Sequence, residues 1–170
     1  MNYSFFRCIA SLTASLMLAA PVPLLAGDAP DDAAAVVLSF NDAVSARDLD
    51  KLLSHFAEGG VQFNLRPSHQ GLKNESLTSD LKARWSMVGP VLFSATKKYQ
   101  READILDSQI RGDIATVWAD IESETVMAGS DKTNEEEFTE VYLLIRTPDG
   151  WKIAGVADNR QPNNTMSGGN

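Results

Sequence analysis

The chain offers few side chains whose types and spacing could carry chemistry. Its two histidines, His55 and His69, stand apart, and neither belongs to a spacing that would bring several ligands to one metal ion. The sequence also contains no Gly-x-Ser-x-Gly nucleophile motif, phosphate-binding loop, dinucleotide fingerprint or calcium loop. We therefore predict no metal, no cofactor and no standard catalytic set, with His69 near a possible pocket mouth.

A small group of polar and aromatic residues could instead line a binding pocket. Gln62 and Asn64 are two positions apart on a predicted strand, so their side chains point to the same face. Their polarity, at positions where apolar residues would be easier to bury, predicts that they face a pocket. The aromatic side chains of Trp85, Trp118 and Tyr142 could line that pocket or pack as core.

Acidic residues recur on the predicted central strands, namely Asp104, Asp107, Asp120, Glu122 and Glu124. Their alternation with other residues is typical of the solvated face of a sheet. In the alternative interpretation, one or two of them point inward, where burial would suit them to act as general acids or bases. The run Glu135-Glu136-Glu137 is expected to be solvated.

The first 26 residues have the order of a secretory signal peptide. Arg7 is the only charge in residues 1–7, an apolar stretch follows, and small residues precede a plausible cleavage point after Ala26. Pro21 and Pro23 interrupt the apolar run before it reaches the roughly 20 residues of a membrane span. We expect a periplasmic or secreted protein; an uncleaved anchor and a cytosolic start are the alternatives. Cleavage would remove Cys8, the only cysteine, so no disulfide would stabilise the mature chain.

The composition restricts the possible partners. The 170 residues carry a formal net charge of −8, without a cluster of lysine and arginine. Nucleic acids and anionic membranes both attract such clusters, so neither is an expected partner after signal cleavage.

The remaining pattern predicts one α+β domain over residues 33–160, after a lead-in at 27–32 and before a disordered tail at 161–170. Helical spacing begins at Ala33, Asp48 can cap a second helix that ends at Gly59-Gly60, and Gly89-Pro90 ends a third helix over 75–88. A strand over 61–64 and a loop over 65–73 separate the last two helices. Further strands are predicted over 91–99, 101–109, 114–126, 138–146 and 151–156, with a turn at 111–113, a polar loop at 128–137 and another turn at 147–150. Helices followed by antiparallel strands predict helices gathered on one face of a curved sheet, with a hollow between the layers.

These elements resemble the nuclear-transport-factor-2-like superfamily, which includes ketosteroid isomerase, scytalone dehydratase, limonene epoxide hydrolase and the SnoaL-like polyketide cyclases. The resemblance covers nearly all of residues 33–160. It rests on Val36-Val37-x-x-Phe40, Ala46-Arg47-Asp48-Leu49-Asp50, Phe56-Ala57-Glu58, Gly71 and Asp149-Gly150-Trp151-Lys152-Ile153. It implies a cone-shaped α+β fold with three N-terminal helices, a deep pocket and, in many members, a homodimer formed through the outer sheet face.

The resemblance does not extend to ketosteroid isomerase chemistry. The position similar to its oxyanion tyrosine is Phe40, which has no hydroxyl, and the position similar to its base is Asn64. The second oxyanion donor would fall near Glu140 to Tyr142. The histidines that many SnoaL-like sequences carry on the last strand are also absent, since Gly155 and Ala157 stand there.

We therefore expect an exported domain that binds a small, partly apolar molecule in a pocket inside the cone, without a standard catalytic set. The expected ligand-binding residues are Phe40, Gln62, Asn64, Trp85, Trp118, Glu140 and Tyr142. One alternative is an isomerase, dehydratase or hydrolase that uses Glu140, Tyr142, His69 or Asp158. Another is a non-catalytic dimerisation or interaction module whose pocket is filled.

Overall fold

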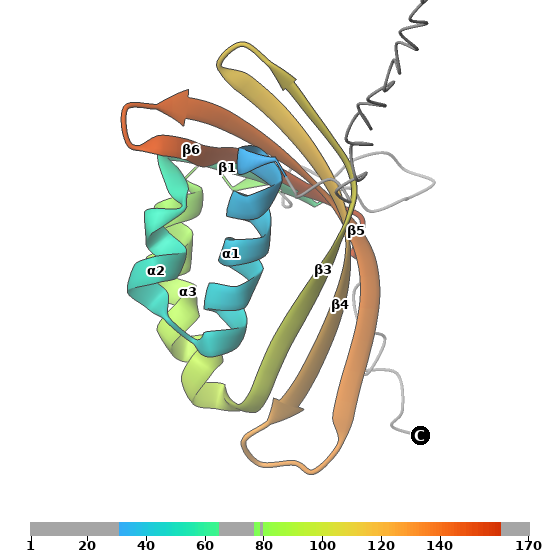
Figure 1. Ribbon diagram of the computed structural model, residues 1–170. Helices are drawn as coiled ribbons and strands as arrows, with labels where there is room; N and C mark the ends of the chain where they lie inside the picture. Colours follow the sequence, from blue (N-terminus) through green and yellow to red (C-terminus); the bar gives the residue numbers. More distant parts are fainter. Residues whose placement is uncertain (1–30, 65–76, 79, 161–170) are drawn as a thin grey trace, which may run out of the picture.

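A computed structural model describes residues 31–64, 77–78 and 80–160, which form three helices on the concave face of a curved sheet (Figure 1). The elements follow one another as α1 (Asp32–Ala46), α2 (Leu49–Ser54), β1 (Phe56–Asn64), β2 (Leu77–Thr78), α3 (Leu81–Ala95), β3 (Thr96–Arg111), β4 (Ile114–Met127), β5 (Thr133–Thr147) and β6 (Gly150–Asp158). The predicted signal peptide, the loop over 65–73 and the tail lie outside the described residues. The predicted start of the third helix at residue 75 is wrong, because residues 77–78 form strand β2 and α3 begins at Leu81.

The six strands form one sheet in the order β2-β1-β6-β5-β4-β3. All neighbouring strands are antiparallel except β1 and β6, which are parallel. Strands β3, β4 and β5 are long and bend around the helices, with α1 on their concave side (Figure 1). This arrangement confirms the predicted cone-shaped α+β fold. No helix among the described residues is long and apolar enough to cross a membrane.

Aspartate caps begin all three helices. The Asp31 carboxylate accepts hydrogen bonds from the backbone N–H groups of Ala33 and Ala34, at 3.0 and 2.8 Å. Asp48, the predicted cap, accepts one from the N–H of Lys51, and Asp80 caps α3 in the same way. Each cap satisfies backbone donors that the first helical turn leaves without a partner.

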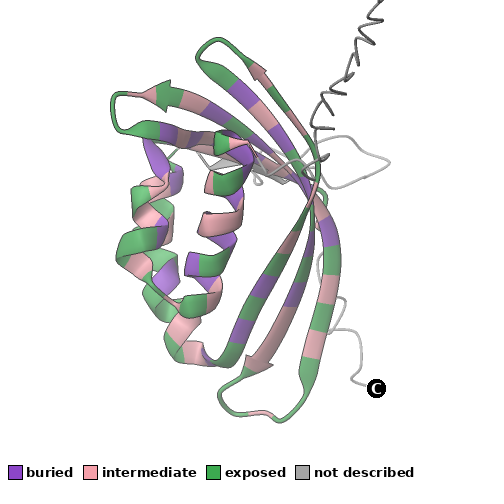
Figure 2. Cartoon of the chain, in the orientation of Figure 1, coloured by how far each residue is buried: buried purple, intermediate pink, exposed green. Residues whose placement is uncertain are grey.

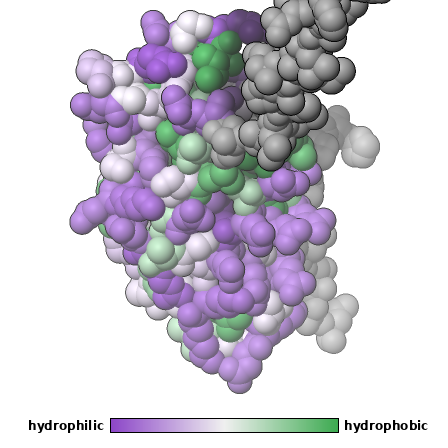
Figure 3. Space-filling view, in the orientation of Figure 1, coloured by the Kyte–Doolittle hydropathy of each residue, from purple (hydrophilic) through white to green (hydrophobic). Residues whose placement is uncertain are grey.

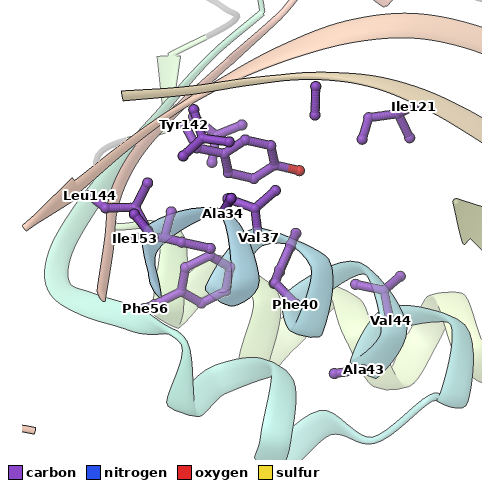
Figure 4. Close-up of a cluster of buried hydrophobic side chains, with 14 of the residues drawn as sticks. Ala34, Val37, Phe40, Ala43, Val44, Phe56, Ile121, Tyr142, Leu144 and Ile153 are labelled. Carbon is purple, nitrogen blue, oxygen red and sulfur yellow. The ribbon is translucent and has the colours of Figure 1, made fainter. Parts of the chain in front are cut away.

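The core lies between α1 and the inner face of the sheet. Along β4, Ala115, Val117, Ala119 and Ile121 are fully buried and alternate with more exposed residues, as the sequence pattern predicts. Buried and exposed residues alternate in the same way along the other long strands (Figure 2). Figure 4 shows Tyr142 of β5 facing Ala34 and Val37 of α1, with Phe40 and Phe56 nearby. Hydrophilic side chains cover most of the face seen in Figure 3.

The predicted end of the second helix at Gly59-Gly60 is wrong. Helix α2 ends at Ser54, and both glycines belong to β1. A Cβ atom on Gly60 would lie 3.3 Å from the backbone oxygen of Ala154, so glycine allows β1 to approach β6 closely. Here the glycine pair serves close strand packing and not a helix terminus.

The predicted end of the third helix at Gly89-Pro90 is also wrong, because α3 continues to Ala95. Pro90 lies on the exposed side of the helix, while Gly89 is buried against Leu49. Beyond them, Leu92 and Phe93 pack on the core. This packing outweighs the intrinsic cost of proline within a helix.

Two strand boundaries also differ from the prediction. Residues 91–95 of the first predicted strand belong to α3, whereas residues 96–99 and the second candidate over 101–109 belong to the single strand β3, which begins at Thr96. Strand β5 begins at Thr133, so most of the predicted polar loop is paired with β4, including Glu135 opposite Glu124 and Glu137 opposite Glu122. The turns at 111–113 and 147–150 and the strands that follow them are confirmed.

Candidate functional site

A cavity of about 540 Å³ lies between α3 and the inner face of the long strands. One part of its lining comes from α3, and the rest comes from β1, β3, β4, β5, the connection between β4 and β5, and the segment after β6. The lining residues on these and adjoining segments are Gln62, Arg84, Trp85, Val88, Leu92, Tyr99, Arg101, Thr125, Met127, Ser130, Lys132, Asn134, Glu136, Glu140 and Arg160.

The helical wall of the cavity is apolar. Trp85, Val88 and Leu92 recur three or four residues apart on α3, so they share one side of the helix. Tyr99 and Met127 add further apolar surface from the strands. This wall suits the hydrocarbon or aromatic part of a ligand.

The opposite side of the cavity contains a buried ion pair. Nη2 of Arg101 donates a hydrogen bond to Oε2 of Glu140 at 2.6 Å, and the two side chains are only 3% and 4% exposed. The hydroxyl of Tyr142 donates a hydrogen bond to the same carboxylate oxygen. Nδ2 of Asn41 donates to the Tyr142 hydroxyl oxygen at 3.2 Å and to the carbonyl of Val37 at 2.9 Å. A chain of hydrogen bonds therefore runs from Asn41 of α1, by way of Tyr142 on the inner face of the sheet, to the ion pair at the cavity.

The position of Arg101 is fixed from α1. Its backbone N–H donates to the Ser45 hydroxyl oxygen at 2.7 Å, and that hydroxyl donates to the Arg101 carbonyl at 2.9 Å. The guanidinium carbon lies 5.5 Å from the centre of the Phe138 ring and 6.0 Å from that of Phe40. These contacts hold the charge against aromatic faces and beside its carboxylate partner.

Burial and the charge of Glu140 determine the protonation states of Arg101 and Tyr142. Burial alone would lower the pKa of Arg101, but the adjacent Glu140 carboxylate raises it above the ordinary value for arginine. Burial raises the pKa of Tyr142 well above its ordinary value, and the charge of Glu140 raises it further. Arg101 therefore remains charged and Tyr142 remains a neutral hydrogen-bond donor at physiological pH.

A second buried carboxylate lies beside the ion pair. Asp158 of β6 stands directly opposite Glu140 of β5 and is 4% exposed. It accepts hydrogen bonds from Nε2 of Gln62 and from the backbone N–H of Arg160, both at 3.1 Å. Burial and, to a smaller extent, the charge of Glu140 raise the pKa of Asp158, whereas the hydrogen bond from Gln62 opposes that rise. Two neighbouring carboxylates in different environments are a chemical basis for proton transfer.

Three of the predicted ligand-binding residues line the cavity, namely Gln62, Trp85 and Glu140. Tyr142 does not line it but lies fully buried behind Glu140. Phe40 is also core: its ring contacts Phe56, Trp85 and Tyr142 at centroid distances of 5.3, 6.1 and 6.1 Å. The prediction that Phe40 contributes to the pocket lining is therefore wrong, because Phe40 is buried in the core and only its neighbours Trp85 and Arg101 line the cavity.

The prediction that Trp118 lines the pocket is wrong. Trp118 lies between the inward-facing Val117 and Ala119, so its own side chain points to the outer face of the sheet, where it is 45% exposed. Asn64 pairs with Asp158 along the backbone, but its side chain lies outside what the structure describes, as does His69. The cavity-facing prediction for Asn64 therefore stays a prediction.

Sequence reasoning missed Arg101 and Asn41. Arg101 occupies an inward position of β3, in line with Tyr99, and a charged residue in such a row is the signal that could have identified it. Asn41 lies next to Phe40 on α1 and is only 1% exposed. Among the described residues, no group of three histidine, cysteine, aspartate or glutamate side chains could hold a metal ion.

Comparison with known proteins identifies the class to which this fold and cavity belong. The family model of the SnoaL-like domain matches residues 33–156, so the chain belongs to the SnoaL-like family. This membership confirms the resemblance to the nuclear-transport-factor-2-like superfamily. A search of curated proteins finds no match.

Solved structures of similar fold carry a range of names. A ketosteroid isomerase-like protein from Erwinia carotovora atroseptica is 16% identical, with a TM-score of 0.62 and coverage of 78% of this chain and 97% of that chain. A candidate scytalone dehydratase from Novosphingobium aromaticivorans is 6% identical, with a TM-score of 0.63 and coverage of 75% and 80%. A nuclear transport factor 2 superfamily protein from Salmonella enterica is 12% identical, with a TM-score of 0.58 and coverage of 80% and 93%. At these identities the similarity shows the fold alone.

Proposed function

We propose that this SnoaL-like domain binds a small, partly apolar molecule in the cavity between α3 and the sheet. The observation that carries the proposal is the pairing of an apolar wall with a buried, hydrogen-bonded charge pair across an open space. Trp85, Val88 and Leu92 would contact the apolar part, while Gln62, Arg101 and Glu140 would orient its polar groups. The cavity volume also argues against the alternative of an interaction module whose pocket is filled by its own aromatic residues.

The first test is native mass spectrometry of protein purified gently from its own host, followed by extraction of any retained molecule under denaturing conditions. We expect a retained small molecule in the wild-type protein and its loss in Thr125→Trp, in which a large side chain enters the cavity. Thr133→Trp is the matched control, because Thr133 is exposed at the start of β5 and lies outside the cavity lining. Retention of the same molecule by Thr125→Trp would contradict the proposal.

A second candidate function is acid–base catalysis on the bound molecule, which the Glu140–Asp158 pair specifically favours. Asp158 does not itself line the cavity, but it lies directly behind two residues that do, Gln62 and Glu140. With its raised pKa, it would donate or accept the proton at this edge of the cavity, and Gln62 would hold its carboxylate in place. Asp158→Asn should then abolish turnover of an identified ligand while binding persists. Full turnover by that variant would exclude this role.

We also propose export and self-association, each from a separate feature. The sequence of residues 1–26 supports export and cleavage, which N-terminal sequencing of protein from the periplasm or medium would test. A homodimer through the outer sheet face is supported by four exposed apolar side chains, Leu106, Ile114, Trp118 and Leu143. Trp118→Glu should convert the dimer to a monomer in light scattering, and a monomeric wild-type protein would refute the dimer.

A further inference from the structure

One row of side chains on the inner face of the sheet borders the cavity and carries no charge. Tyr99 of β3 stands opposite Thr125 of β4, which in turn stands opposite Asn134 of β5. All three residues line the cavity, across from the apolar wall of α3. Since neighbouring strands lie about 4.8 Å apart, this neutral row spans about 10 Å. Its phenol, hydroxyl and amide can form hydrogen bonds with a ligand.

The hydroxyl of Tyr99 is available to a ligand. Tyr99 is only 8% exposed, yet its hydroxyl forms no hydrogen bond with another described residue. Arg101, two residues further along β3, interacts with it through its charge alone. Tyr142 of β5 differs, because its hydroxyl donates to Glu140 and accepts from Asn41. Since buried tyrosine hydroxyls usually have a partner, a molecule in the cavity is the expected partner of Tyr99.

Four of the six charged residues of the lining are paired with one another. Nη2 of Arg101 donates to Oε2 of Glu140 at 2.6 Å, and Nε of Arg160 lies 3.6 Å from Oε2 of Glu136. An ionised group on a ligand would lose its hydration in the cavity without gaining an unpaired countercharge from these residues, which is costly. The interior of the cavity therefore favours an uncharged ligand.

The other two charged residues of the lining, Arg84 of α3 and Lys132, are exposed to solvent. Arg84 also has an interaction of its own. Because dissolved ions screen exposed charges, neither residue supplies a buried countercharge to a ligand.

We propose that the cavity selects an uncharged molecule with a hydrogen-bond-accepting oxygen, such as an ester or amide carbonyl, to which the Tyr99 hydroxyl donates. The apolar body of this ligand would pack on Trp85, Val88 and Leu92 across the cavity. The rest of the neutral row would contact further polar groups of the ligand. This inference rests on the proposed binding function and adds the chemical class of the ligand and a residue that determines specificity.

Three naphthalene probes of similar shape test the proposal by equilibrium dialysis at neutral pH. Methyl 2-naphthoate carries a neutral ester, 2-naphthoate carries a carboxylate, and 2-sec-butylnaphthalene carries only hydrocarbon. We expect the wild-type protein to bind the ester about tenfold more tightly than the carboxylate, because the carboxylate loses its hydration. Tyr99→Phe should bind the ester about fivefold more weakly than wild type does, since one hydrogen bond is lost, and should bind the hydrocarbon unchanged.

Tyr99→Phe should unfold in urea with the same free energy as wild type, because its hydroxyl has no hydrogen-bond partner among the described residues. The control is Thr133→Val, which removes a hydroxyl from an exposed residue outside the cavity lining and should bind all three probes as wild type does. Equal affinity of Tyr99→Phe and wild type for the ester would overturn the inference. A wild-type protein that binds the carboxylate as tightly as the ester would overturn it as well.

A further variant separates failure of this inference from failure of the proposed function. Thr125→Trp places a large side chain in the cavity and should abolish binding of the ester and the hydrocarbon while the cooperative unfolding transition remains. If it does so but Tyr99→Phe binds the ester as wild type does, the cavity binds ligands and only this inference fails. If Thr125→Trp binds both probes as wild type does, the cavity is not the binding site and the proposed function itself fails. A wild-type protein that binds neither probe would overturn this inference, and native mass spectrometry would still decide the proposed function.

Discussion

Removal of the Arg101 guanidinium should be among the most damaging single changes in this domain. In Arg101→Met, the carboxylate of Glu140 stays buried and keeps only the hydroxyl of Tyr142 as a hydrogen-bond donor from this group. Breaking a buried ion pair by removing one partner costs about 3–5 kcal/mol. The contacts of the guanidinium with Phe40 and Phe138 are lost as well. Since a domain of this kind has about 5–15 kcal/mol of total stability, Arg101→Met should be severely destabilised.

Urea denaturation followed by circular dichroism would measure this loss. Arg146→Met is the control, because Arg146 also lies over an aromatic ring, Trp151 at 4.2 Å, but its side chain is 46% exposed and its ion pair with Asp113 spans 3.7 Å. We expect the control to lose no more than about 1 kcal/mol. The contrast between the two arginines isolates the effect of burial.

A double-mutant cycle shows whether the loss comes from the unpaired charge. Arg101→Met, Glu140→Met removes both charges and fills the space with apolar atoms, which is often close to neutral. The double variant should therefore be more stable than Arg101→Met, with a coupling of about 2–3 kcal/mol between the two positions. A loss below about 1 kcal/mol in Arg101→Met, or additive losses in the double variant, would refute this reasoning.

Three further predictions concern neighbouring groups and one turn. Tyr142→Phe should lower the free energy of unfolding by about 1–3 kcal/mol in urea denaturation, because buried Glu140 loses a donor. The pKa of Asp158 is higher in the folded state than in the unfolded state, so the wild-type protein loses stability as the pH rises through these two values. Asp158→Asn lacks this titration, so its free energy of unfolding should rise relative to that of wild type between pH 3 and pH 7. A difference between the two proteins that does not change with pH would contradict this prediction. Gly150→Ala should cost about 1–2 kcal/mol because φ is +100°, whereas Gly129→Ala, without a positive φ and with open space around its Cβ, should change the melting temperature little.

Local sequence patterns predicted the fold correctly where a pattern is typical of only one kind of secondary structure. The alternation of Val117, Ala119 and Ile121 identified the buried face of β4, and Asp48 identified the start of α2. The patterns failed at Gly59-Gly60 and Gly89-Pro90, where the same residues can end a helix or permit close packing. Gly60 packs against β6 and Gly89 packs against Leu49. Both partners are distant in the sequence, so local patterns could not show that these glycines permit close packing.

The candidate site was harder to predict because polar residues in the interior depend on partners from other elements. Glu140 was identified through the family resemblance, but its cation Arg101 lies 39 residues away on a different strand. Asn41 follows Phe40 on α1 and is polar, yet its amide lies in the core, where its Nδ2 donates hydrogen bonds to the Tyr142 hydroxyl and the carbonyl of Val37. Without those partners in view, polarity predicts exposure.

The extent of the cavity is nevertheless readable from the inward row of β4. From Ala115 to Ile121 that row is apolar and is covered by α1, whereas Ser123 and Thr125, the next two residues of the row, are polar. The pairing of Ile121 with Phe138 of β5 marks the boundary, because the next inward pairs are Ser123 with Glu136 and Thr125 with Asn134. Side chains of this kind do not fill the space beneath α3 with a dry core, so a cavity forms there. The change of polarity along β4 therefore marks where its inner face passes from the core under α1 to the cavity, although Glu140, which pairs with Ala119, brings one charged group of the lining into the apolar part.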